Sequence, residues 1–346
     1  MYRHLAWLGR RFQPSFIEMP FSKKLRYKLE FIALYTLTKV IPALPEGVAH
    51  SLGVTLGKLA YRFDKRGRAT ALENLTLIFG KEKSKIEIEC IAQMSYRSFA
   101  KTVIDQLRSP KITADNYLEF VDLVMEDPQA MEDAAEAGAI WVTPHYSNFE
   151  WIALIMGFRG CSFTIVAQDF KNESLTEMYK ANREVSGHNV IPQKNALFAL
   201  LRSLKRGGHA AFLTDLAVKP SKTAAVIECF GKKVSVTAIH AELQKRTGLP
   251  VIPGICIPLE DGRYEMHGFK PLIFGPDDSS DTIAQACWDV FEPIIRENPA
   301  PWLWMYKHFR FLPSAEEKDN YPSYARPNLR FEEMVARQEE GKLKKT

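Results

Sequence analysis

The sequence predicts an α/β protein in which a mixed central β-sheet is flanked by helices and is preceded by N-terminal helices. Short apolar runs at residues 139–143, 161–167 and 209–213 alternate with stretches of helical periodicity. Strands that alternate with helices in this way are typical of α/β folds. The 346 residues are 46% hydrophobic and 25% charged, which is enough to bury a sizeable core.

Charge and cysteine content restrict the classes of function. The net charge of +5 fits an acidic partner or an anionic membrane surface and does not specifically indicate nucleic acid. The five cysteines form no C-x-x-C pair and have no histidine at metal-ligand spacing, so we expect reduced packing residues and no metal site. Residues 1–20 lack a continuous apolar core and a cleavage site, so no secretory signal is expected.

Residues 31–44 are the most apolar N-terminal stretch. They fall short of the ~20 residues that a spanning helix needs and contain Lys39. Basic residues at 23–28 precede them, which favours an interfacial helix on the cytoplasmic side, although a core helix of a soluble domain is equally compatible. We therefore predict a helical, membrane-anchoring segment at 1–64, a catalytic domain at 65–314 and a charged C-terminal tail at 315–346.

Further elements follow from local patterns. Helical spacing predicts helices over residues 46–63, 85–107, 175–186, 196–205 and 288–298. Residues 62–68 form a basic run of the kind that is usually solvated. Asp261-Gly262 predicts a hairpin between residues 252–258 and 264–269, and residues 332–346 suggest a solvated helix or a frayed tail.

Residues 139–158 carry the strongest chemical signal. Pro144 interrupts the apolar strand, and a helix with an apolar stripe then begins near Phe149, with Ser147 or Asn148 as N-cap. His145 and Glu150 lie about 140° apart on a continuous helix, so they meet only if His145 occupies the turn before it. Such a pair deprotonates a hydroxyl group. The alternative is a buried histidine bonded to a backbone carbonyl, with Glu150 solvated.

The segment PHYSNFEW after a strand resembles the H-x4-D/E motif of glycerolipid and lipid A acyltransferases. The surrounding chain is most similar to the lipid A biosynthesis (lauroyl and myristoyl) acyltransferases and implies their glycerolipid acyltransferase-like fold. The resemblance implies that His145 is the general base on an acceptor hydroxyl and that Glu150 orients it. It further implies substrate-binding roles for Asn148, Arg183, Asp215, Phe230 and Gly231. The sequence departs from the family pattern at Leu216, Ile239, Tyr306 and His308.

The resemblance implies an O-acyltransferase that needs no cofactor and no metal. Its donor would be a thioester of acyl carrier protein or CoA, its acceptor a glycolipid, and its location the cytoplasmic face of the bacterial inner membrane, held peripherally or by a single anchor. An acidic carrier protein could meet basic residues such as Arg159, Lys171, Lys194, Lys205 and Arg206. The chain has no G-x-S-x-G, Walker or G-x-G-x-x-G motif. Two alternatives stay open: an acyltransferase acting with acyl-CoA on a mannosylated phosphoinositide or lysophospholipid, and a non-catalytic membrane-surface protein.

Overall fold

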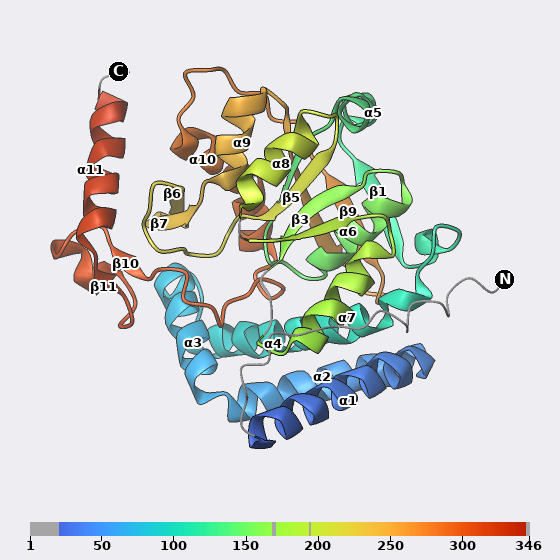
Figure 1. Cartoon of the computed structure of the whole chain (residues 1–346). Coiled ribbons are helices and arrows are strands. Elements are labelled where there is room, and N and C mark those ends of the chain that lie inside the picture. Colours follow the sequence, from blue (N-terminus) through green and yellow to red (C-terminus); the bar gives the residue numbers. More distant parts are fainter. Residues whose placement is uncertain (1–20, 168–170, 194, 344–346) are drawn as a thin grey trace.

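A computed structural model of the chain describes residues 21–167, 171–193 and 195–343. It confirms the predicted mixed α/β architecture, a central and mostly parallel sheet flanked by helices (Figure 1). The seven strands run in the order β1-β9-β8-β2-β5-β3-β4. Their bounds are β1 Val121–Met125, β2 Ile140–Thr143, β3 Phe163–Ala167, β4 Asn189–Pro192, β5 His209–Leu213, β8 Val251–Pro258 and β9 Tyr264–Gly268. Two small sheets pair β6 (Ala224–Cys229) with β7 (Lys232–Thr237) and β10 (Phe311–Leu312) with β11 (Arg326–Pro327).

From β8 to β4, each strand is parallel to the next one in the sheet order. The predicted hairpin at Asp261-Gly262 is confirmed, because β9 returns antiparallel to β8. Since β9 also pairs in parallel with β1, this hairpin makes the sheet mixed. The carboxyl ends of β2 and β5 therefore lie side by side at one edge of the sheet, where ligands bind in open α/β sheets.

Alternation along the strands divides the core between the two faces of the sheet. In β2, Ile140 and Val142 join the cluster that packs against α8 (Ala196–Leu204), α9 (Ile239–Thr247) and α10 (Ser280–Glu297). Trp141 points to the opposite face, where the cluster includes residues of α5 (Pro128–Ala137) and α6 (Phe149–Phe158). Helix α7 (Glu173–Glu184) follows β3.

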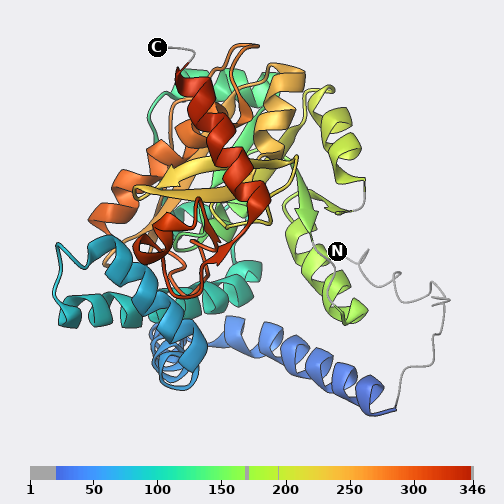
Figure 2. The same cartoon turned by 90° about the vertical axis from the view of Figure 1, so that its left-hand side faces the viewer.

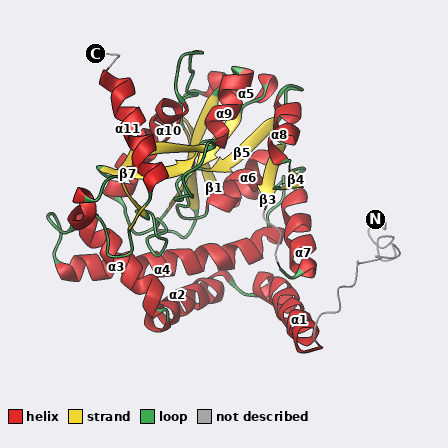
Figure 3. Ribbon diagram, turned by 60° about the vertical axis from the view of Figure 1, so that its left-hand side comes forward, coloured by secondary structure: helices red, strands yellow, loops and turns green. Residues whose placement is uncertain are grey.

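Within the described residues, four helices between residues 21 and 108 form a layer below the sheet (Figure 3). They are α1 Phe21–Ala43, α2 Glu46–Phe63, α3 Lys65–Phe79 and α4 Lys85–Arg108. A Cβ added at Gly57 of α2 would stand 2.5 Å from the Cα of Arg97 in α4, so glycine permits the two backbones to approach closely. Most of the basic run 62–68 belongs to α3, whose Ala71, Leu75 and Phe79 are buried. The basic run itself is solvent-exposed at residues 62–66, as predicted, and the buried residues of α3 lie beyond it.

Helix α1 projects from the body of the molecule (Figure 2). Ile41 near its end is buried, whereas large apolar side chains along most of its length are exposed. Of the two alternatives for this stretch, the core helix is therefore wrong. Among the helices of the described residues, none is long and apolar enough to cross a membrane.

The C-terminal part of the chain is more ordered than a tail. Helix α11 (Leu329–Leu343) buries Phe331, Met334 and Val335 against Val226 of β6. Of the two predicted forms, helix and frayed tail, the structure has the helix. Residues 344–346 lie outside the described part. Short 3₁₀ turns complete the fold at Ser109–Lys111, Tyr117–Glu119 and Glu316–Asn320.

Candidate active site

His145 lies in the turn between β2 and α6, as the sequence predicts. Pro144 ends the strand, and Ser147 adopts a φ of 49°, a left-handed conformation that a residue with a side chain rarely takes. Backbone strain of this kind persists only where the surroundings hold it. The turn directs His145 away from the axis of α6 before the helix begins at Phe149.

The register of the sheet places Asp215 opposite His145. Thr143 pairs with Leu213, and each residue of interest lies two positions farther along its chain. The His145 ring lies with Nδ1 2.7 Å from Asp215 Oδ1, and the His145 backbone N–H donates to Oδ2 at 2.9 Å. One carboxylate therefore fixes both the ring and the backbone of the histidine.

Glu150 has a different partner. Its Oε1 accepts a hydrogen bond from Arg183 Nη2 at 2.6 Å, and its Oε2 accepts from Arg183 Nε at 3.3 Å. The structure thus gives the orienting position on His145 Nδ1 to Asp215 rather than to Glu150. The cause is geometric, because Glu150 lies in the first turn of α6 while Asp215 comes from the adjacent parallel strand.

Asp215 is held as an anion. Burial raises its pKa, but the positive charge and hydrogen bonds of His145 outweigh burial, so the pKa lies below its ordinary value. The Trp302 indole N–H also donates to Asp215 Oδ2, at 2.8 Å. A carboxylate in this form only accepts hydrogen bonds, so Nδ1 of His145 carries the proton and Nε2 is the basic nitrogen.

The basic nitrogen is open to a reactant. The His145 side chain is 16% exposed, and among the described residues none makes a hydrogen bond to Nε2. The Phe149 ring lies edge-on to the imidazole at 5.0 Å. An imidazole with a buried carboxylate on one nitrogen and a free second nitrogen is suited to accept a proton from a hydroxyl group.

A distant segment holds the turn in place. The backbone N–H of Ser147 donates to the Pro301 carbonyl at 3.0 Å, and the Tyr146 hydroxyl donates to the Asn298 carbonyl at 2.9 Å. From α4, the Thr102 hydroxyl donates to the Ser147 carbonyl at 2.9 Å. These contacts stabilise the strained backbone beside the histidine.

The other predicted substrate-binding residues lie in packed surroundings. The Asn148 side chain is fully buried and makes no capping bond to α6. Phe230 and Gly231 have positive φ and form the turn between β6 and β7, where the Phe230 ring packs against Trp302 and Trp304. Their contacts with substrate stay predictions.

The basic residues predicted for a carrier protein are exposed at Arg159, Lys171, Lys205 and Arg206, whereas Lys194 lies outside the described residues. Arg159 caps the end of α6 that is opposite the turn at His145. Arg206 precedes the start of β5, the end of the strand remote from Asp215. Arg159, Lys205 and Arg206 therefore lie away from His145, whereas Lys171 follows the carboxyl end of β3, and a contact of these side chains with a carrier protein stays a prediction.

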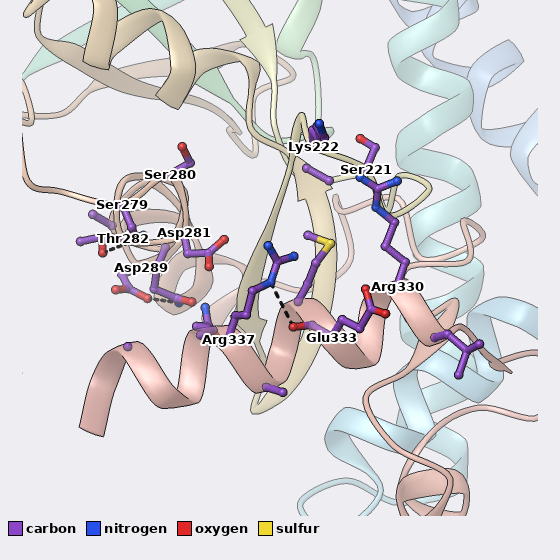
Figure 4. A pocket seen from close by; sticks show the side chains of 18 residues that line it. Ser221, Lys222, Ser279, Ser280, Asp281, Thr282, Asp289, Arg330, Glu333 and Arg337 are labelled. Atoms are coloured by element: carbon purple, nitrogen blue, oxygen red, sulfur yellow. Dashed lines mark hydrogen bonds between the residues drawn. The ribbon is translucent and has the colours of Figure 1, made fainter. Parts of the chain in front are cut away.

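An open groove of about 1470 Å³ lies between α10 and α11. Hydrogen bonds within its lining include those from Gln285 to the Asp289 carboxylate and from Arg337 to the Glu333 backbone carbonyl (Figure 4). Neither His145 nor Asp215 lines it. The reactive histidine and this groove are thus separate features.

The sequence is similar to those of known acyltransferases. The sequence model of the bacterial lipid A biosynthesis acyltransferase family matches residues 18–311. The phosphatidylinositol mannoside acyltransferase of Mycolicibacterium smegmatis is 24% identical over 268 residues, 76% of this chain and 86% of the relative. The lipid A biosynthesis lauroyltransferase of Escherichia coli is 23% identical over 293 residues, 83% and 93% of the two chains.

Proposed function

The chain belongs to the bacterial lipid A biosynthesis acyltransferase family, and on that premise we propose that it moves a fatty acyl chain from an acyl thioester to a hydroxyl group of a lipid A precursor. The observation that carries the proposal is the pair formed by the His145 ring and the buried Asp215 carboxylate. Acyl carrier protein is the proposed donor of the thioester.

In the proposed mechanism His145 Nε2 takes the proton of the acceptor hydroxyl as its oxygen attacks the thioester carbonyl. Asp215 stabilises the imidazolium that forms and keeps the ring in the reactive tautomer. The tetrahedral oxyanion is stabilised by the backbone N–H groups at the start of α6. Collapse breaks the C–S bond, and the imidazolium returns its proton to the leaving thiolate.

We assign Glu150 a positioning role in place of direct contact with the imidazole. Its bidentate ion pair with Arg183 joins the first turn of α6 to α7. This pair fixes the helix that follows the catalytic turn. The substrate-binding role that the resemblance implies for Arg183 is compatible with this position.

We propose that α1 and α2 rest on the cytoplasmic face of the membrane, where the lipid acceptor resides. Exposed apolar side chains on α1 include Leu25, Leu29, Ile32 and Val40, with basic residues at 23, 24 and 28 on the same helix. Headgroups attract the basic residues, and the acyl region buries the apolar ones. Asn172, which precedes α7, donates to the Tyr27 carbonyl of α1 at 3.0 Å, so α1 is tied to the helix that carries Arg183.

A second acceptor is supported by the comparisons. The mannoside acyltransferase and the lauroyltransferase are about equally similar to this chain, at 24% and 23% identity. A mannosylated phosphoinositide is therefore the alternative acceptor, with acyl-CoA as its donor.

A crossed assay separates these proposals. The purified full-length protein is incubated with an acyl carrier protein thioester or acyl-CoA, each combined with a lipid A precursor or a phosphatidylinositol mannoside. Mass spectrometry then measures the masses of the lipid products. We expect one added acyl chain on the lipid A precursor with the carrier protein donor. Acylation of the phosphatidylinositol mannoside alone would identify the mannoside as the acceptor. No acylated product in any combination would support the non-catalytic alternative.

A further inference from the structure

Trp302 reaches the catalytic pair from a segment 87 residues beyond Asp215 in the chain. We propose that Trp302 is a positioning residue whose indole N–H occupies Asp215 Oδ2, so that Oδ1 alone serves the imidazole and less negative charge acts on the His145 ring. The inference rests on the proposed function, because it concerns the basicity of the same histidine.

The contacts of the Asp215 carboxylate show how this works. Oδ2 accepts two hydrogen bonds, from Trp302 Nε1 at 2.8 Å and from the His145 backbone at 2.9 Å. Oδ1 faces His145 Nδ1 at 2.7 Å. Three donors around one fully buried carboxylate fix its rotation, and two of them withdraw negative charge from the oxygen that does not face the ring.

The indole is itself held rigidly. Trp302 is fully buried, its ring stacks on His308 at 4.0 Å, and it meets the Trp304 ring edge-on at 4.7 Å. The Ser95 hydroxyl donates to the Trp302 carbonyl at 2.6 Å, and Trp302 forms an isolated β-bridge with Tyr146 beside the histidine. These contacts hold the Trp302 side chain in one rotamer, in which the indole N–H points at Asp215.

The other groups that face Asp215 stay neutral over the working pH range. Burial lowers the pKa of His308 to about 4. Burial raises the pKa of Cys229 well above its ordinary value and raises that of Tyr306. From α6 and α7 come Glu150 and Arg183, whose opposite charges are paired with each other. Near neutral pH these groups therefore add no net charge beside the Asp215 carboxylate.

Loss of the indole N–H has a definite direction. Without it, more negative charge remains on Asp215, and a more negative partner stabilises the imidazolium form of His145. The pKa of His145 then rises, and a larger fraction of the enzyme is protonated and inactive at neutral pH. The acid limb of the kcat/KM profile moves to higher pH.

The chain offers a matched pair of variants. Trp302→Phe keeps a ring against His308 and removes the donor to Asp215. Trp304→Phe makes the same chemical change in the same buried segment, but its indole donates to the Pro299 carbonyl at 2.6 Å and does not reach the carboxylate. We expect Trp302→Phe to move the acid limb of the kcat/KM profile to higher pH by about 0.5 to 1 pH unit, because this shift corresponds to a fraction of the free energy of one hydrogen bond to a charged group. Trp304→Phe should leave the acid limb at its wild-type position.

Nitrogen NMR of the histidine rings follows the same pKa without turnover, with the His145 signal assigned through its loss in His145→Asn. An upward shift in Trp302→Phe alone supports the inference even if no acyl acceptor is found. Equal profiles for wild type and Trp302→Phe, in an enzyme that His145→Ala inactivates, overturn the inference and leave the proposed function standing.

A measurement on the wild type covers the case in which Trp302→Phe does not fold. The indole N–H resonance of Trp302 should move with pH along the titration curve of His145, because both groups bond to the same carboxylate. If the chemical shift of the Trp302 indole N–H does not change along that titration curve, the inference is overturned.

Discussion

At the scale of single residues, the contact between the His145 ring and the Asp215 carboxylate joins two positions 70 residues apart in the chain. His145 follows a strand and a proline, and both signals are local. Asp215 was placed at a strand end by resemblance alone, as a substrate-binding residue. The two meet because β2 and β5 are neighbours, and the order of strands in a sheet is set by long-range packing that no local pattern encodes.

Trp302 was absent from the predicted site for the same reason. Its segment is aromatic and apolar, which is typical of a core, and the polar function of one indole N–H depends on where Asp215 lies. One sequence signal could have linked His145 and Asp215. Each of the two residues lies two positions beyond the end of an apolar strand.

Substitution of the two acidic residues distinguishes their roles. Asp215→Asn removes the anion that stabilises the imidazolium and disturbs the ring tautomer, so we expect kcat to fall by about 10² to 10⁴. Glu150→Gln keeps an oxygen toward Arg183 and should cost less than about tenfold. Steady-state acyl transfer by both variants, with circular dichroism as the folding control, provides the comparison. A large loss in Glu150→Gln beside a near-normal Asp215→Asn would return the orienting role to Glu150.

At the scale of elements, periodicity predicted most helices but not their contacts. Helix α2 was expected from its apolar spacing, and the structure begins and ends it at the predicted residues, Glu46–Phe63. Helix α3 was not predicted from the sequence, because basic residues dominate its start. Its apolar residues Ala71, Leu75 and Phe79 nevertheless recur every four residues. Its Asn74 donates to the carbonyls of Trp304 and Tyr306, a role that only the folded chain reveals.

The crossing of α2 and α4 is testable with two glycines of one helix. Gly57→Ala places a methyl group against the α4 backbone, so the helices must separate, and we expect a loss of about 1 to 3 kcal/mol in the free energy of unfolding. Gly47→Ala is the control, because nothing lies within 4 Å of a Cβ at that position. Urea denaturation of both variants measures the difference. Equal stability of the two would contradict the close crossing.

At the scale of the whole molecule, the exposed α1 and α2 helices give one side of the protein an apolar and basic character. We expect the wild type to bind vesicles that contain anionic lipid and to bind less as salt rises. Replacing Leu29 and Ile32 by glutamate should weaken binding by about tenfold or more, since each side chain loses its burial in lipid.

The control for the vesicle experiment is Leu329→Glu at the start of α11, which changes a leucine that is more exposed than Leu29, 78% against 57% accessible. Co-sedimentation with vesicles measures all three proteins. If Leu329→Glu weakened binding as much as the α1 changes, the assignment of the membrane face to α1 would be wrong.

Buried histidines give the whole molecule a predictable response to acid. Burial lowers the pKa of His188 and His209, and it lowers those of His240 and His308 to about 4. The unfolded chain then binds more protons than the folded one below about pH 6.5, so stability is full above that pH and falls as the pH drops toward 4. His240 and His308 each contribute on the order of 3 kcal/mol to this loss at most.

His240 allows a direct test of that loss. Both of its ring nitrogens are buried without a hydrogen-bond partner in the described part of the chain, so leucine can replace it without stranding a polar group. We expect His240→Leu to flatten the dependence of the unfolding free energy on pH between 6.5 and 4. An unchanged slope in urea denaturation at several pH values would show that His240 titrates normally.

The central claim is that this acyltransferase uses His145, paired with Asp215, to deprotonate a lipid hydroxyl. The most direct measurement is mass spectrometry of the lipid product after the purified wild type or His145→Ala is incubated with an acyl thioester and the lipid A precursor. The account predicts one added acyl chain with the wild type and none with a folded, vesicle-binding His145→Ala. Acyl transfer by His145→Ala at the wild-type rate would contradict it.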